Sequence, residues 1–250
     1  MLVTLGTNKA IGSGASVTFP YACKSVQKIF IKIDDTSTSG EAYSHTTTIQ
    51  LGSRTICNGV SGFGLVGMAQ LQANSHSKPN ELMYQIDLGS HQLLDNENLY
   101  VTINALDALD AVDVSAQVDE PTGGELPVRY TEYSDNVFTA ENVLRAISYA
   151  ISRAAVDEDA YNIEIRNQVS SSAPSLISAN NWFACETYST EHRGQFGALV
   201  KSILPLTTTF NYSASATTNR VLVASQMGTS QRAVKQSVNA QRVAKSQVGR

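Results

Sequence analysis

The chain has 250 residues, of which 42% are hydrophobic and only 16% are charged, and this length allows one large or two modest domains. The opening residues show neither the basic segment nor the apolar core of a signal peptide, and no run approaches the roughly 20 apolar residues of a membrane-spanning helix. The net charge of −4 is unevenly distributed: residues 1–191 hold all 22 acids and 10 of the 18 Lys and Arg, whereas residues 192–250 hold the other 8 and no acid. We therefore expect a soluble protein made in a cytoplasm, with an acidic body and a basic end that has an electrostatic partner.

The first half of the chain predicts a series of strands. Its strand-like segments alternate apolar with polar residues or are rich in β-branched residues, and turn signals separate them. These segments are residues 15–19, 26–33, 46–51, 82–88, 98–104 and 112–118. No convincing amphipathic helix interrupts them, so the pattern favours an antiparallel sandwich over repeated βαβ units.

A Pro- and Gly-rich stretch at residues 121–127 (PTGGELP) is the strongest linker candidate, and it divides the chain near its midpoint. It predicts a first domain over residues 1–122, a second over 123–228 and a tail over 229–250. We expect an all-β or β-rich α+β protein in which two jelly-roll sandwiches stand in tandem and are followed by a flexible basic tail.

The second half echoes the first in four places, which indicates a duplicated domain of about 110 residues. The matching pairs are residues 28–34 with 145–151, 48–51 with 162–165, 101–105 with 210–214, and 113–119 with 221–227. Residues 139–156 (TAENVLRAISYAISRAAV) stay ambiguous. Their alanines favour a helix, whereas the duplication favours a strand, and a mixed α+β second half is the alternative.

Two patterns could carry chemistry of a catalytic or metal-binding kind. Residues 62–67 (GFGLVG) match the G-x-G-x-x-G spacing of a dinucleotide site, and Asp87 follows 20 residues after Gly67. Because no βαβ context surrounds this motif, a loop or bulged strand is favoured over the nucleotide site of an enzyme. Asp107, Asp110 and Asp113 form an acidic cluster that could bind calcium, as could residues 157–159, although solvated turn carboxylates are the simpler interpretation.

Cysteine and histidine give no ligand pattern. Cys23, Cys57 and Cys185 are too far apart for a disulfide framework or a zinc site, so they are expected to be small buried hydrophobic residues. The histidines lie in polar stretches and are expected to be solvated. We expect no catalytic residues and no cofactor, with calcium as the one ion to consider.

Two further features point to assembly. Trp182 and Phe183 are either core residues or anchors of a subunit interface. The tail carries five cations and no acid, which suits phosphates of nucleic acid or anionic lipid head groups. These cations are Arg232, Lys235, Arg242, Lys245 and Arg250.

The segments at residues 11–20 (IGSGASVTFP), 29–33 (IFIKI) and 48–54 (TIQLGSR) resemble, in their order, the opening of major coat proteins from tailless, membrane-containing bacteriophages of the corticovirus and tectivirus kind. The resemblance lies in strand order and total length and extends loosely over the chain. It implies two jelly rolls side by side, homotrimers that form the pseudo-hexameric capsomers of an icosahedral shell, and chain ends at the capsomer base facing an internal membrane. The tail would then face that membrane or the packaged genome.

The sequence thus favours a structural protein of the virion capsid, with itself and other virion proteins as partners. The alternatives are a minor vertex or spike protein of the virion, a carbohydrate-binding β-sandwich module and, least favoured, an enzyme.

Overall fold

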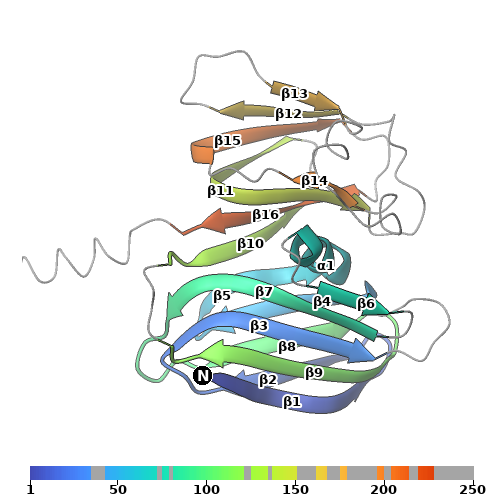
Figure 1. The fold of residues 1–250 in the computed structure, drawn as a ribbon, viewed down its shortest axis with the longest axis vertical. Coiled ribbons are helices and arrows are strands. Elements are labelled where there is room, and N and C mark those ends of the chain that lie inside the picture. The colour runs from blue at the N-terminus through green and yellow to red at the C-terminus, as the bar shows by residue number, and fades with distance from the viewer. Residues whose placement is uncertain are drawn as a thin grey trace, which may run out of the picture.

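The chain is all-β with a single helix in the part that the structure describes. The computed structural model describes residues 1–34, 43–71, 75–78, 81–120, 125–134, 137–150, 162–167, 175–178, 196–199, 204–213 and 219–227. Its strands form two sandwiches that follow one another along the long axis of the molecule (Figure 1).

The first sandwich is a jelly roll. One sheet has the order β1 (Leu2–Ile11), β9 (Leu109–Val118), β3 (Ser25–Asp34), β7 (Glu81–Gln92) and β6 (Ser75–Lys78). The other has the order β2 (Ser16–Tyr21), β8 (Leu99–Ala105), β4 (His45–Leu51) and β5 (Arg54–Ser61). If its eight main strands are lettered B to I along the chain, with β6 as an addition to the edge, the sheets read B-I-D-G and C-H-E-F, the arrangement of a jelly roll.

Alternation along the strands builds the core of this sandwich. Ile29, Ile31 and Ile33 of β3 are at most 1% exposed, and they face Val101 and Ile103 of β8, which are fully buried. Because successive strand residues point to opposite faces, the residues between them, such as Phe30 and Tyr100, lie on the outer faces of the two sheets.

The second sandwich has the same strand order in a less regular form. Its strands are β10 (Val128–Tyr133), β11 (Val137–Ala150), β12 (Asn162–Asn167), β13 (Ser175–Ser178), β14 (Phe196–Leu199), β15 (Leu204–Ser213) and β16 (Asn219–Gln226). Residues 137–143 of β11 pair with β15, whereas residues 143–150 pair with β16 and β14. One sheet therefore reads β10-β16-β11-β14 and the other β11-β15-β12-β13, which is again B-I-D-G and C-H-E-F with strands C and D fused in β11.

The strand β11 must fold back for this arrangement to close. A straight strand of its 14 residues would separate residues 137 and 150 by about 43 Å at 3.3 Å per residue. Val137 pairs with Asn211, and Ala150 pairs with Asn219. The chain from Asn211 to Asn219 spans at most about 29 Å even when fully extended. Figure 1 shows the β11 ribbon turning back. The turn is near Asn142, whose φ of 50° is left-handed.

The internal echo seen in the sequence falls on equivalent strands. Its four pairs match β3 with the second part of β11, β4 with β12, β8 with β15, and β9 with β16. They are strands D, E, H and I of the two jelly rolls. Residues 139–150, which could have been a helix, belong to the strand β11, while 151–156 lie outside the described residues.

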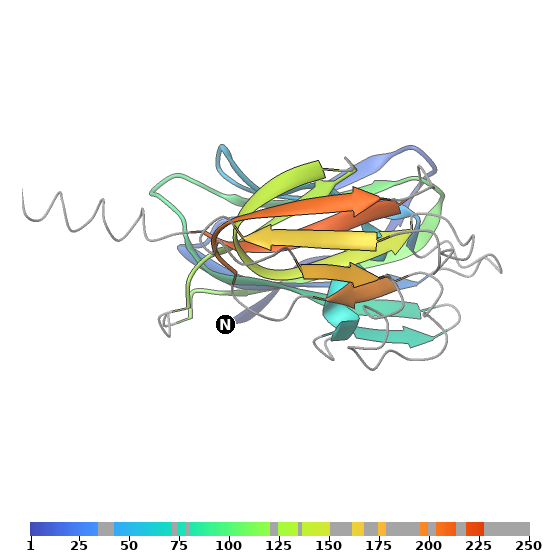
Figure 2. The ribbon, with the colours of Figure 1, turned by 90° about the horizontal axis from the view of Figure 1, so that it is seen from above.

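A continuous sheet and one helix join the two sandwiches. Strand β5 pairs in parallel with β10 through Cys57 and Tyr130, so an 11-stranded sheet runs through both. Helix α1 (Gly62–Leu71) lies between them (Figure 1). Seen along the long axis, the strands of both sandwiches run in roughly the same direction (Figure 2).

The helix α1 corrects one prediction. Residues 62–67 are neither a loop nor a bulged strand, because the G-x-G-x-x-G segment forms the first turns of α1. All residues of the helix except Gln70 are apolar or glycine, and residues 62–69 are buried apart from the partly buried Phe63. This removes the amphipathic period by which surface helices are recognised.

Candidate functional site

One end of the strands gathers the N-terminus, the connection between the sandwiches and the last described residues. The amino group of Met1 donates hydrogen bonds to the carbonyl of Val118 (2.7 Å) and to Oε1 of Glu120 (2.8 Å). The Met227 amide donates to the carbonyl of Pro127 (2.7 Å). We call this the basal end, and define it by residues 1, 118–120, 125–127 and 227.

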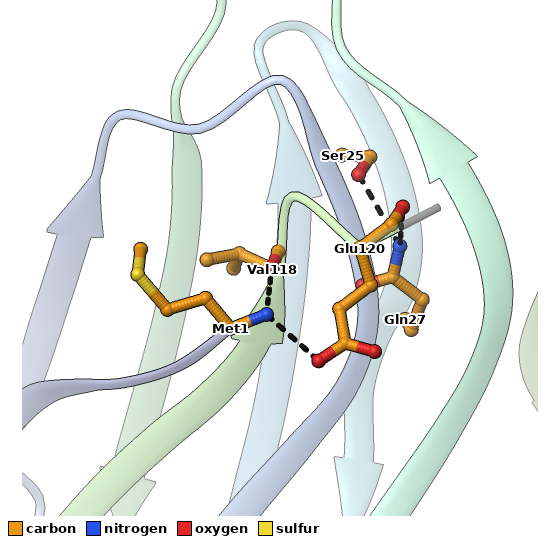
Figure 3. A network of polar contacts seen from close by, with 5 residues as sticks. All are labelled: Met1, Ser25, Gln27, Val118 and Glu120. Carbon is orange, nitrogen blue, oxygen red and sulfur yellow. Dashed lines mark hydrogen bonds and ion pairs between the residues drawn. The ribbon is translucent and has the colours of Figure 1, made fainter. Parts of the chain in front are cut away.

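A polar network holds the basal end together (Figure 3). Nε2 of Gln27, 7% exposed on a bulge of β3, donates to Oγ of Ser25 (3.2 Å) and to the carbonyl of Glu120 (3.4 Å). The Met1 ammonium group holds the pKa of the Glu120 carboxyl below its ordinary value. Together these contacts fix the point at which the chain leaves the first sandwich.

Helix α1 makes the junction between the sandwiches apolar. Leu65, Val66 and Met68 are at most 2% exposed and share one cluster of buried side chains with Ile147 and Leu222 of the second sandwich. Gly62 begins the helix where an added Cβ would collide with the His45 ring and the Tyr43 carbonyl. The glycine is therefore required by close packing.

Hydrogen bonds from β7 to β10 add a polar part to the junction. The Tyr130 hydroxyl donates to the carbonyl of Asp87 (2.7 Å), and Nε2 of His91 lies 2.9 Å from the carbonyl of Val128. Gly89 lies between these contacts with φ of 66°, and a Cβ there would collide with the Leu126 carbonyl. The chain from Leu126 to Tyr130 thus lies directly against the basal half of β7.

His91 is neutral in this position. Burial lowers the pKa of its imidazole to about 4, and the nearby Arg54 guanidinium acts in the same direction. Because a carbonyl only accepts, Nε2 of His91 carries the proton and donates to Val128. Arg54 is itself held by Oε2 of Glu97 (2.7 Å) and the carbonyl of Gln92 (2.8 Å).

The prediction of solvated histidines is wrong for two residues. His45 is fully buried and His91 is 1% exposed. Nε2 of His45 lies 2.7 Å from the Tyr84 hydroxyl, so this pair bridges the two sheets of the first sandwich. The side chains of His76 and His192 lie outside those that the structure describes.

The cysteines that the structure describes behave as small core residues. Cys57 is buried, Cys23 is partly buried, and both are free thiols. Burial raises the pKa of the Cys57 thiol to about 12 and that of the Cys23 thiol to about 11. Thiols held in the protonated form are poor nucleophiles and poor metal ligands. Cys185 lies outside the described residues.

The acidic cluster does not assemble into an ion site. Asp107 accepts a hydrogen bond from Oγ of Ser44 (2.6 Å), and Oδ1 of Asp113 accepts from the Asn8 amide (2.6 Å). Asp110 and Asp113 lie on the strand β9, so they are not turn carboxylates. Within the described ranges, no three His, Cys, Asp or Glu side chains lie close enough to hold a metal ion. The arrangement therefore gives no support to calcium at these three residues.

The other predicted sites lie outside the described residues. They are residues 157–159, Trp182, Phe183, and the tail cations Arg232, Lys235, Arg242, Lys245 and Arg250. In the described part of the chain, no helix is long and apolar enough to span a membrane.

The residues of the junction and the basal end could not be recognised from sequence patterns. Tyr130, His91 and Glu120 carry no motif, because their roles depend on contacts far apart in the sequence. Gly89 was the one detectable signal, since a glycine inside a strand pattern often marks a close approach of another backbone.

The strand order and the shared junction define a double jelly-roll protein. The solved structures include one with this arrangement over nearly the whole chain: the crystal structure of the major capsid protein P2 from bacteriophage PM2. The match covers 90% of this chain and 96% of the phage protein, with a TM-score of 0.50 and 9% sequence identity. At that identity the likeness establishes a common fold.

Two further solved structures are less similar to this chain, and their low TM-scores do not establish a common fold. A turret protein of Sulfolobus turreted icosahedral virus matches with a TM-score of 0.23 and 10% identity, over 91% of this chain and 100% of the other. A plant receptor-like kinase matches with a TM-score of 0.26 and 8% identity, over 87% and 84% of the two chains. No family model and no curated protein matches the sequence.

Proposed function

We propose that this chain is a structural coat protein of a virus, and that three copies form a pseudo-hexameric capsomer of an icosahedral shell. The observation that carries the proposal is the pair of jelly rolls joined by a shared sheet and a buried helix, with the fold of a phage major capsid protein over 90% of the chain. A rigid pair of similar units is suited to a ring, because repeated contacts between unlike faces close when the rotation between them allows it.

The edges of the first sandwich fit a protein whose partners are other copies of itself. Among the strands that the structure describes, β1 and β2 end their sheets and leave backbone groups available for pairing. The pairing of β1 with β9 shifts register at three points, so the edge is irregular and resists uncontrolled strand addition. Such an edge favours contacts made by specific side chains.

The basal end defines the orientation of the coat protein in the proposed shell. Met227, from which the basic tail continues, lies beside the connection between the sandwiches and at the same end as Met1. In this proposal the basal end faces the interior of the virion, and the tail cations meet phosphates there, either of internal lipid or of the packaged genome.

The mass of the purified full chain in solution tests the coat function. We expect a trimer of about 81 kDa, three times the chain mass of 26.9 kDa, or larger particles. A strict monomer at tens of micromolar would contradict the proposal, and a monomer that binds polysaccharide would favour a carbohydrate-binding module.

The tail is tested separately with vesicles containing anionic lipid and with duplex DNA. Removing residues 229–250 is expected to leave the trimer intact and to abolish salt-sensitive binding to one of these probes, which identifies the partner. Binding of both probes that is unchanged by the truncation would contradict a role for the tail.

A further inference from the structure

The two sandwiches differ in how their equivalent sheets are covered. The outer face of β10-β16-β11 has an apolar centre that is buried inside the chain. Tyr130, Ile147, Leu222 and Ala224 are at most 3% exposed and belong to the same cluster as the α1 side chains. Val221 and Val223, the alternate residues of β16, point into the second sandwich. The centre of this sheet is therefore buried on both faces.

The equivalent outer face of the first sandwich lies on β1, β9, β3 and β7. Phe30 is at its centre, with Ser115 of β9 and Gln85 of β7 as its cross-strand neighbours. Met83, on the same face, is 44% exposed, and Leu2 at its edge is 67% exposed. We call this surface, comprising residues 2, 28, 30, 32, 83, 85 and 115, the Phe30 face.

Charged residues surround the aromatic centre. Lys28 and Lys32 lie on either side of Phe30 along β3, and Nζ of Lys32 pairs with Asp34 (2.9 Å) and Glu81 (3.7 Å). A partly exposed aromatic residue within a charged rim is typical of a surface that is soluble alone and buried in a complex. The equivalent face of the second sandwich has a buried apolar centre and also carries charges, because Glu132 lies opposite Leu222 on it and pairs with Arg220 (3.7 Å).

The segment that covers the second sandwich has a defined place in the jelly roll. Helix α1 lies between β5 and β7, which are strands F and G of the first sandwich. Strands F and G of the second sandwich are β13 and β14, and residues 179–195 connect them. This connection contains Trp182 and Phe183, and Trp182 is the only tryptophan in the chain.

We propose that the Phe30 face is the docking surface for a second copy of this chain, which presents its β13–β14 connection with Trp182 and Phe183. Inside each chain, α1 and β7 of the first sandwich contact the second sandwich. The proposed contact between copies is its equivalent, with the second sandwich of one copy against the first sandwich of the next. Its two surfaces are different, so copies join head to tail into a closed ring. The inference rests on the proposed coat function and names the surfaces through which the copies meet.

A charge at the centre of the Phe30 face tests the proposal. Phe30→Glu is expected to leave a folded chain that is monomeric at concentrations where the unmodified protein is a trimer. Tyr100→Glu is the matched control, because Tyr100 is a partly exposed aromatic residue on the outer face of the opposite sheet. This control is expected to assemble normally, and circular dichroism and the melting temperature establish folding of both variants.

The outcomes separate this inference from the coat function. A folded Phe30→Glu variant that still forms trimers as readily as the unmodified chain overturns the Phe30 face as the docking surface and leaves the coat function standing. Loss of assembly in both variants also overturns it, because the effect is then not specific to this face. An unmodified chain that never assembles overturns the coat function itself.

A crosslink tests the partner side without relying on loss of assembly. Cys185 lies three residues after Trp182, and Ser115→Cys introduces a thiol beside Phe30. Mild oxidation of the assembled variant is expected to join chains covalently, and Cys185→Ser is expected to abolish the link. An assembled variant that gives no link, or a link that survives Cys185→Ser, contradicts the proposal.

Discussion

Single buried polar residues hold the junction between the sandwiches in one geometry. The imidazole of His91 and the hydroxyl of Tyr130 each meet a backbone carbonyl across it, at 2.9 and 2.7 Å. A buried donor that loses its acceptor costs about 1–3 kcal/mol, so a displaced second sandwich is penalised at both residues. These contacts define the position of β10 more narrowly than the apolar packing of α1 can.

Protonation of His91 is expected to destabilise the protein in acid. Its pKa is about 4 in the fold and 6.5 when unperturbed, so between these values the unfolded chain binds a proton that the folded chain excludes. This contribution to stability is fully present above pH 6.5 and is lost as the pH falls toward 4. Between pH 7 and 4.5 the loss is about 2 kcal/mol.

Urea denaturation of the unmodified chain and of His91→Gln at these two pH values measures this contribution. Glutamine can donate to the Val128 carbonyl but does not titrate, so the variant is expected to lose about 2 kcal/mol less than the unmodified chain. An equal loss in both proteins would show that His91 does not titrate in this way.

Gly89 is expected to tolerate no side chain. Gly89→Ala combines a left-handed φ of 66° with a collision against the Leu126 carbonyl. It should lower the free energy of unfolding by a few kcal/mol. Gly12→Ala is the matched control, since a Cβ there meets nothing within 4 Å. Chemical denaturation compares the two, and equal small effects would contradict the close approach.

Strands whose apolar and polar residues alternate regularly could be predicted from the sequence, whereas helices and strands with an irregular burial pattern could not. The predicted segments at residues 26–33 and 98–104 correspond to β3 and β8, whose apolar residues face one core. Strand β5 was missed because Asn58 and Gly59 form a bulge opposite Thr48 and interrupt its alternation. Helix α1 was missed because it is buried on nearly every side.

The fused strand β11 was hard to recognise for a related reason. Its alanines favour a helix, and both faces of its second part are buried. The apolar residues therefore follow neither the helical period nor the strand period clearly. Pairing with β15 and β16, which are distant in sequence, decides in favour of the strand. Local propensity is overridden here by tertiary contacts.

The turn inside β11 is expected to depend on Asn142. Asparagine tolerates its φ of 50°, glycine adopts this conformation freely, and valine does not. Asn142→Gly should therefore leave stability nearly unchanged, whereas Asn142→Val should cost about 1–3 kcal/mol in thermal or chemical denaturation. Equal stability of the two variants would argue against a left-handed turn at this position.

For the complete chain, the sequence pattern indicated two similar halves because equivalent strands follow one another in the same order in both. It could not indicate how the halves join, since β5–β10 pairing and the α1 contacts link residues far apart in the chain. The boundaries at residues 122 and 228, and the roles of Trp182 and the tail, stay predictions.

Electron microscopy of the purified, assembled protein shows whether three copies form a pseudo-hexameric capsomer. We expect particles with three-fold symmetry and six densities of similar size around the axis, two from each chain. Isolated two-lobed particles, or assemblies without a three-fold axis, would contradict it.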